Sequence, residues 1–73
     1  MRYYFHLESE KNIVIDSRGK DFDLRFDAIS HASAMARDLG DDETWIGWSV
    51  RVIDDRNAEV FSVPVRASIL STK

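Results

Sequence analysis

Apolar and polar residues alternate along residues 2–8, a period of two that is typical of a β-strand with one buried face. The polar residues 8–12 suit a turn, and the β-branched residues 13–15 predict a second strand that pairs with the first as a hairpin. The side chains that we expect on the buried face of the first strand are Tyr3, Phe5 and Leu7.

A short alternating segment, residues 22–26, leads into a predicted helix over residues 27–39. Asp27, or Asp23 if the helix begins earlier, can cap its start because a carboxylate accepts hydrogen bonds from free N–H groups. We expect Gly40 to end the helix in the left-handed conformation that favours glycine. Small residues on the buried stripe would let the helix lie close to a sheet. This stripe comprises Ala28, Ala32, Met35, Ala36 and Leu39.

Two further strands follow the predicted helix. Residues 46–54 and residues 59–65 each alternate, and a polar connection joins them. Pro64 has no N–H to donate to a β-ladder, which favours a place at a sheet edge or a strand end. On the buried face of the first of these two strands we expect Ile46, Trp48, Val50 and Val52.

The element order β-β-α-β-β predicts an α+β fold, a small, mostly antiparallel, four-stranded sheet with one helix packed on one face. In this interpretation residues 1–66 form a single domain and residues 67–73 form a loose C-terminal tail. A chain of 73 residues buries about 60 % of the surface that its unfolded form exposes, so it has room for one small core.

Several motifs occur together along the chain: the opening Arg-Tyr-Tyr-Phe-His-Leu, the Asp16-x-x-Gly19 turn, the alanine-rich helix, Gly47-Trp48, and Val50-x-Val52-x-Asp54 with a closing strand that ends near Pro64. Through these features the chain resembles, over nearly its whole length, a family of short bacterial proteins of unknown function built as hairpin, helix and hairpin. The sequence departs from the family at the last turn, where Asn57-Ala58 stands in place of the usual glycine. The resemblance implies the fold and a bacterial origin, and it implies no catalytic residues.

Composition narrows the classes of function. The sequence has no cysteine, which excludes disulfides, thiolate zinc sites and cysteine nucleophiles, and such a small domain without crosslinks is expected in the cytoplasm. Residues 1–6 show no signal-peptide pattern, and no segment approaches the roughly 20 apolar residues of a membrane span, so we expect no membrane contact. The net charge of −3 and the scattered basic residues argue against a nucleic-acid partner.

No pattern of side chains predicts a catalytic, cofactor or metal site, so we expect a protein that is not an enzyme. The histidines His6 and His31 could share a metal ion only if they converged, and a helix over the Tyr3 face would leave His6 pointing away. The acidic loop, residues 38–43, lacks the spacing and central glycine of a calcium loop. Trp45 could cap the end of the sheet or stay exposed as a contact residue.

The predicted sheet face opposite the helix is more apolar than a solvent-facing surface usually is. Hairpin pairing would bring Ile53 and Val60 together there, and a contiguous apolar patch needs an explanation that isolated apolar residues do not. We hypothesise that this face, or an adjacent free edge, is an association surface, in its simplest form that of a homodimer. The candidate interface residues are Tyr4, His6, Val14, Arg51, Ile53 and Val60.

The leading interpretation is therefore a non-catalytic interaction module that binds a second copy of itself or another protein. The alternative is a small nucleic-acid or ligand-binding domain that uses Tyr4, His6, Trp45 and Arg51. An enzyme would need a site shared between subunits, with His6 as the natural general base because histidine titrates near neutral pH.

Overall fold

The computed structural model describes residues 1–67, which form five strands, one α-helix and one short 3₁₀-helix. Residue 67 is thus the only part of the predicted tail, residues 67–73, among the described residues. In chain order the elements are β1 (Arg2–Glu8), β2 (Ile13–Val14), β3 (Lys20–Asp21), α1 (Arg25–Leu39), η1 (Glu43–Trp45), β4 (Ser49–Asp54) and β5 (Glu59–Pro64).

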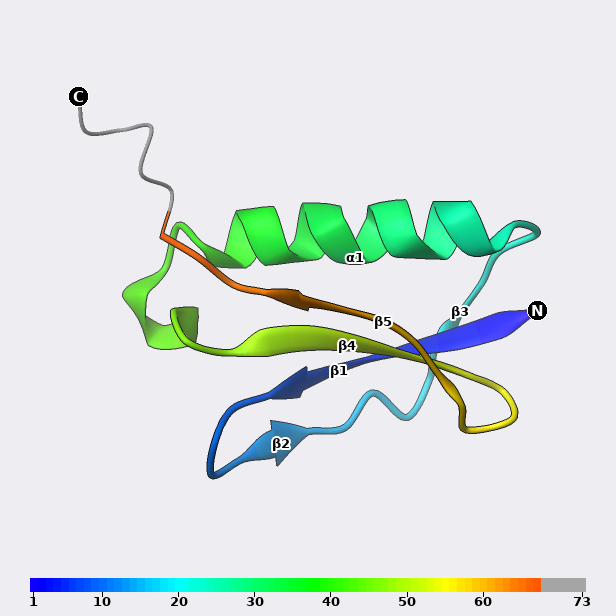
Figure 1. Cartoon of the computed structure of the whole chain (residues 1–73), viewed down its shortest axis with the longest axis horizontal. Coiled ribbons are helices and arrows are strands. Elements are labelled where there is room, and N and C mark those ends of the chain that lie inside the picture. The colour runs from blue at the N-terminus through cyan, green and yellow to red at the C-terminus, as the bar shows by residue number, and fades with distance from the viewer. Residues whose placement is uncertain (68–73) are drawn as a thin grey trace.

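The sheet is antiparallel throughout, and β1 lies in its middle (Figure 1). On one side β1 pairs with β4, which pairs in turn with β5. On the other side it pairs with β2 near its end and with β3 near its start. The α+β fold with one helix on one face is therefore confirmed. The sheet has five strands rather than four because a second short segment, β3, which lies outside the strand predicted over residues 13–15, also pairs with β1.

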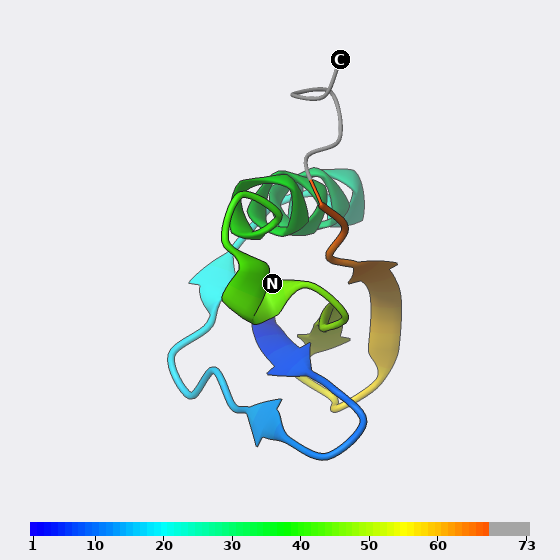
Figure 2. The ribbon, with the colours of Figure 1, turned by 90° about the vertical axis from the view of Figure 1, so that its left-hand side faces the viewer.

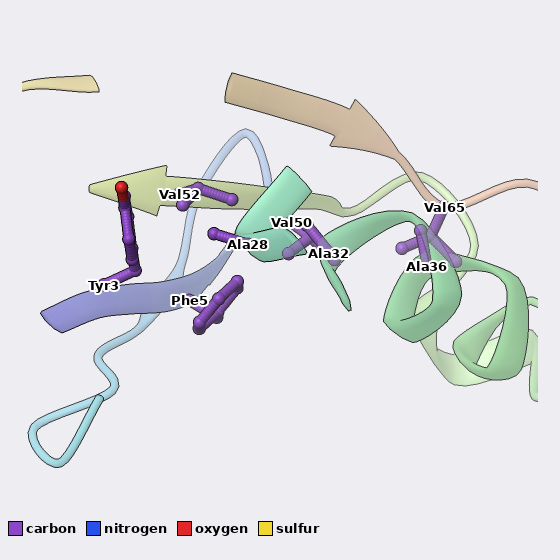
Figure 3. Packing of buried hydrophobic residues seen from close by; sticks show 8 residues of the cluster. All are labelled: Tyr3, Phe5, Ala28, Ala32, Ala36, Val50, Val52 and Val65. Carbon is purple, nitrogen blue, oxygen red and sulfur yellow. The ribbon is translucent and has the colours of Figure 1, made fainter. Parts of the chain in front are cut away.

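The helix lies close to the sheet because its inner face carries alanines. Ala28 and Ala32 are fully buried and Ala36 is 5 % exposed. The bulk of the core therefore comes from the strands, as Figure 3 shows. Burial of each large apolar side chain stabilises the folded state by about 1.5–3 kcal/mol. The buried residues that face the alanines are Tyr3, Phe5, Val50, Val52 and, just after β5, Val65.

Both ends of α1 differ from the prediction. The helix begins at Arg25, and its N-cap is Leu24, whose side chain makes no capping hydrogen bond. Asp27 lies inside the first turn, where its negative charge is favourable next to the positive end of the helix. Gly40 has a right-handed φ of −66°, so the expected left-handed stop is wrong. A side chain is excluded there for another reason, because a Cβ on Gly40 would collide with the carbonyl oxygen of Arg66.

The strand predicted over residues 46–54 begins only at Ser49. The chain first forms η1 and then turns at Gly47, which has a positive φ of 94°. Ile46 is consequently 40 % exposed, and its predicted place in the core is wrong. Trp48 is half-buried and packs against the core. The alternation of apolar and polar residues continues through this turn, and alternation alone does not distinguish a turn from a strand.

The edge strand is split because its middle contains surplus residues. Leu7 pairs with Val14, and Tyr3 pairs with Lys20. Residues 15–19 therefore stand opposite only the three residues of β1 between these pairs. The surplus residues bulge out of the ladder, as bulges at sheet edges commonly do.

The Asp16 carboxylate bridges this gap by accepting three backbone hydrogen bonds. The donors are the N–H groups of Phe5 at 3.1 Å, Arg18 at 3.0 Å and Gly19 at 3.0 Å. The Asp16 N–H in turn donates to Nδ1 of His6 at 3.1 Å. Burial alone would raise the pKa of the Asp16 carboxyl, but these N–H donors outweigh it and hold the pKa below its ordinary 3.8. We call these four hydrogen bonds the Asp16 clasp.

A second aspartate holds the turn between β4 and β5. Asp54 is 9 % exposed, and its Oδ1 accepts hydrogen bonds from the N–H groups of Arg56 and Ala58, both at 2.9 Å. The bond from Ala58 is the main reason that the pKa of Asp54 lies below its usual value. Asn57 adopts a left-handed φ of 67°, which asparagine tolerates better than most residues, so it replaces the glycine expected at this turn.

Replacing Gly40 by alanine tests the contact between the end of α1 and Arg66. Alanine at an unobstructed right-handed position would stabilise the fold by up to about 1 kcal/mol. Here the added methyl group must displace a backbone carbonyl, and overpacking of this kind costs about 1–3 kcal/mol. We expect Gly40→Ala to lower the free energy of unfolding in chemical denaturation. The control, Ser30→Ala on the exposed side of α1, should stay within about 0.5 kcal/mol of the parent. A stabilised Gly40→Ala would contradict the contact.

The Asp16 clasp predicts a specific loss of stability in acid. The folded pKa of Asp16 lies below the unfolded one, so the unfolded chain takes up more protons as the pH falls below 3.8. The stabilisation is complete above that pH and is lost as the pH falls through the folded pKa. Asp16→Asn removes one acceptor oxygen and should cost about 1–3 kcal/mol at neutral pH.

Denaturation of the parent and of Asp16→Asn over this pH range measures the effect. We expect the stability of Asp16→Asn to fall less steeply with acid than that of the parent, because one of the titrating carboxylates is gone. Asp41→Asn, an exposed acid after α1, is the matched control and should keep the slope of the parent. Equal slopes for all three chains would rule out the clasp as a source of acid sensitivity.

Candidate association surface at the sheet edge

The face of the sheet opposite the helix is polar in its middle. His6, Arg51 and Ser62 lie in one row across β1, β4 and β5. The Arg51 Nε donates to Glu59 Oε1 at 2.7 Å, and its Nη1 lies 3.5 Å from Glu8 Oε2. Such partly exposed ion pairs contribute roughly 0–1 kcal/mol each. Their more important effect is that two carboxylates surround the one guanidinium of this row.

The apolar patch expected on this face does not form. Ile53 lies opposite Tyr4 and is only 6 % exposed, whereas Tyr4 is half-buried. The pairing of β4 with β5 shifts after Val52, so Ile53 pairs with Glu59 and Val60 is the extra residue of a β-bulge. Val60 is half-buried and packs against the core. Nothing in the alternating pattern signals this bulge.

Val14 lies on the face opposite to the one predicted for it. Paired residues on neighbouring strands share a face, and Val14 pairs with Leu7, which packs against the core on the helix side. Ile13 pairs with Glu8 and lies on the face away from the helix. A change of one residue in hairpin register inverts the faces of a strand, which is why the sequence alone assigned Val14 to the wrong side.

The most exposed apolar part of the sheet is its edge. Ile13, Val14 and Ile15 are 46 %, 47 % and 59 % exposed. β2 is the last strand in the sheet order, and no strand within residues 1–67 pairs with its outer side. Figure 2 shows β2 on the side of the molecule away from α1. We call residues 13–15 the Ile-Val-Ile edge.

Trp45, the candidate contact residue, is packed rather than free. It is half-buried at the end of η1 and meets Trp48 edge to face, with ring centroids 5.0 Å apart and an interplanar angle of 73°. Both rings pack against the core. Of the two alternatives for Trp45, the structure favours the cap at the end of the sheet.

The two histidines lie on different faces of the sheet. His31 sits on the helix and packs against the rings of Phe5 and Phe22, with centroids 4.9 Å and 5.4 Å away. Burial, and then the positive charge of Lys20, lower its pKa below 6.5. His6 is on the other face, in the Asp16 clasp. Within the described residues no group of three or more histidine, aspartate or glutamate side chains is placed to hold a metal ion.

A shallow hollow of about 410 Å³ lies between the first hairpin turn and the loop before β4. Residues 9–12 and 46–48 line it, and it is open to solvent. Its lining carries one acid, Glu10, and one base, Lys11, while Ser9 and Asn12 hydrogen-bond to each other across the hairpin turn. No helix in the described part of the chain is long and apolar enough to cross a membrane.

Comparison with known proteins places the chain in a family. No curated protein and no solved structure matches it. A family model described as a domain of unknown function, DUF6894, matches residues 2–66. This range contains every strand and the helix, and it agrees with the resemblance to short proteins of unknown function. The chain therefore belongs to the DUF6894 family, a domain of unknown function.

Proposed function

We propose that this protein is a small, non-catalytic interaction module that self-associates through the Ile-Val-Ile edge. The observation that supports it is the run of three consecutive β-branched residues, each about half exposed, that β2 and the following Ile15 form at the unpaired edge of the sheet. Such an edge offers unpaired N–H and C=O groups to another strand, and its apolar side chains gain from leaving water. Addition of a strand at a free edge is a common mode of protein recognition.

The contacts on the open face favour the edge over that face as the place of association. Arg51 is held between Glu8 and Glu59, and His6 accepts a hydrogen bond from the Asp16 backbone. Burying Arg51 and its two carboxylate partners under another chain would require these charges to lose water, which is costly. The Ile-Val-Ile edge carries no charge within its three residues.

The same contacts weigh against the nucleic-acid alternative. A phosphate backbone needs free basic groups, because the affinity comes from displaced counterions. Arg51 already has two carboxylate partners, and the net charge of the chain is −3. We place the module in a bacterial cytoplasm, a proposal that rests on the lack of cysteine and on the family resemblance.

Light scattering across concentration tests the proposal. We expect the average mass of the parent chain to rise with concentration and to reach about 1.5 times the mass of one chain near about 1 mM, as a dimer with a binding free energy of about −4 kcal/mol requires. Ile15→Lys places a charge on the edge, the device by which natural edge strands avoid pairing, and should remain a monomer. A monomeric parent at every concentration would refute the proposal.

Phe26→Lys is the matched control for Ile15→Lys. Phe26 is 71 % exposed, more than Ile15, but it lies in the first turn of α1 rather than on the sheet edge. The same change from apolar to basic should leave association intact there. Loss of association in Phe26→Lys, with Ile15→Lys still associating, would overturn the assignment to the edge. Circular dichroism verifies that both variants are folded.

A further inference from the structure

We infer that two copies of this chain pair antiparallel along the Ile-Val-Ile edge, about a two-fold axis that passes next to Val14. This inference deepens the proposed function and rests on it. It specifies the partner as a second copy and sets the register, so that Ile13 of each copy lies opposite Ile15 of the other, and the two Val14 residues lie opposite each other. The two sheets would then join into one continuous sheet.

The main chain of the hairpin determines which groups are free for this pairing. The Ser9 N–H donates to the Asn12 carbonyl oxygen at 2.8 Å. In an antiparallel pair, the N–H and C=O groups of successive residues point alternately toward the partner strand and away from it. Ser9 and Asn12 point theirs toward each other, so two residues further along Leu7 and Val14 do the same. The N–H and C=O groups of Ile13 and Ile15 therefore point to the free side. These outward groups are the ones that a partner strand can bind.

The three edge segments of the sheet differ in how they are protected. β3 carries two charged residues, Lys20 and Asp21. β5 carries Pro64, which has no N–H, and the bulge at Val60. Charges, proline and bulges are the usual devices that prevent strand addition. Among the described edge segments, β2 alone has none of them within its paired residues, and the bulge of this edge begins only after Val14, with Ile15.

The Asp16 clasp removes the charge that would otherwise protect the edge. Asp16 directly follows Ile15, and an outward carboxylate there would repel a second copy. Its carboxylate is instead turned toward β1, where it accepts the N–H of Phe5. Its own N–H is occupied by His6. The clasp thus leaves the outer side of residues 13–15 uncharged.

The segment is complementary to itself. The sequence Ile13-Val14-Ile15 reads the same in both directions, so an antiparallel copy pairs like with like. A two-fold axis that passes through a residue pairs outward N–H and C=O groups with outward ones, whereas an axis between two residues pairs outward groups with inward ones. An axis at Val14 brings the outward groups of both Ile13 and Ile15 into the pairing. Glu10 and Arg18 flank the segment at opposite ends with opposite charges, and neither belongs to an ion pair among residues 1–67. Antiparallel pairing brings each toward the other on the partner copy.

Single cysteines introduced into the otherwise cysteine-free chain test the register. With the axis at Val14, the two Val14 Cα atoms are about 4.5 Å apart, as in any pair without mutual hydrogen bonds. This lies within the disulfide range of about 4.4–6.8 Å. Ile13 is displaced by two residues from its counterpart, which puts the two Cα atoms more than about 7 Å apart, too far for a bond.

We expect mild oxidation to convert most of the Val14→Cys chain into a disulfide-linked dimer, seen by non-reducing electrophoresis and reversed by reductant. Ile13→Cys and Ile46→Cys should stay largely monomeric, although both positions are about as exposed as Val14. Equal crosslinking of Ile13→Cys would overturn the register. If light scattering shows a dimeric parent and Val14→Cys does not crosslink, this inference fails while the proposed function stands. If the parent is monomeric throughout, both fail.

Discussion

The close approach of an alanine-lined helix to the sheet is the constraint on which the rest of this structure depends. Because Ala28 and Ala32 add almost no volume, the helix can rest on β4 and β5, and the strands must supply the bulk. The helix contacts these two strands most, so its cover falls off toward β2 (Figure 2). Phe22 and His31 fill part of the space over Phe5 on that side. The molecule consequently has one side under the helix and one open side.

The open side shows how a small domain can keep a sheet edge ordered without protecting it against pairing with another strand. A continuous strand opposite β1 would pair the Phe5 N–H through its backbone. The split edge leaves that group to the Asp16 carboxylate, and three N–H donors converge on this one side chain. A carboxylate that accepts several backbone hydrogen bonds is well stabilised, so the bulge is held in place. The arrangement orders residues 15–19 while it turns their negative charge inward.

Much of this fold followed from local pattern, because period-two and helical spacing report which side of an element is buried. The alanine stripe and the core positions Tyr3 and Phe5 are examples. The failures arose where partners distant in sequence decide the outcome. Gly40 has to be small because of Arg66, and the burial of Ile53 follows a bulge in another strand.

The candidate surface was predicted only in its general nature, as a face or an adjacent edge with β-branched residues. Its position depended on the hairpin register, which turned Val14 to the helix side and left residues 13–15 as the exposed apolar part of the sheet. Part of the Asp16 clasp did have a local signal. An aspartate followed two and three residues later by N–H donors is an ordinary turn motif, and Gly19 with its φ of 70° completes it. The hydrogen bond from the Phe5 N–H to the Asp16 carboxylate had no local signal in the sequence.

The physical balance at this edge would make the proposed association weak and reversible. In the single chain, water satisfies the outward N–H and C=O groups of Ile13 and Ile15, so exchanging them for a partner strand changes the free energy little per bond. The drive must then come from side chains that are already half-buried, which leaves about 1 kcal/mol or less for each to gain. Association itself costs several kcal/mol in lost freedom. The proposed association would therefore respond to local concentration, and its small gain per chain would make one charge enough to abolish it.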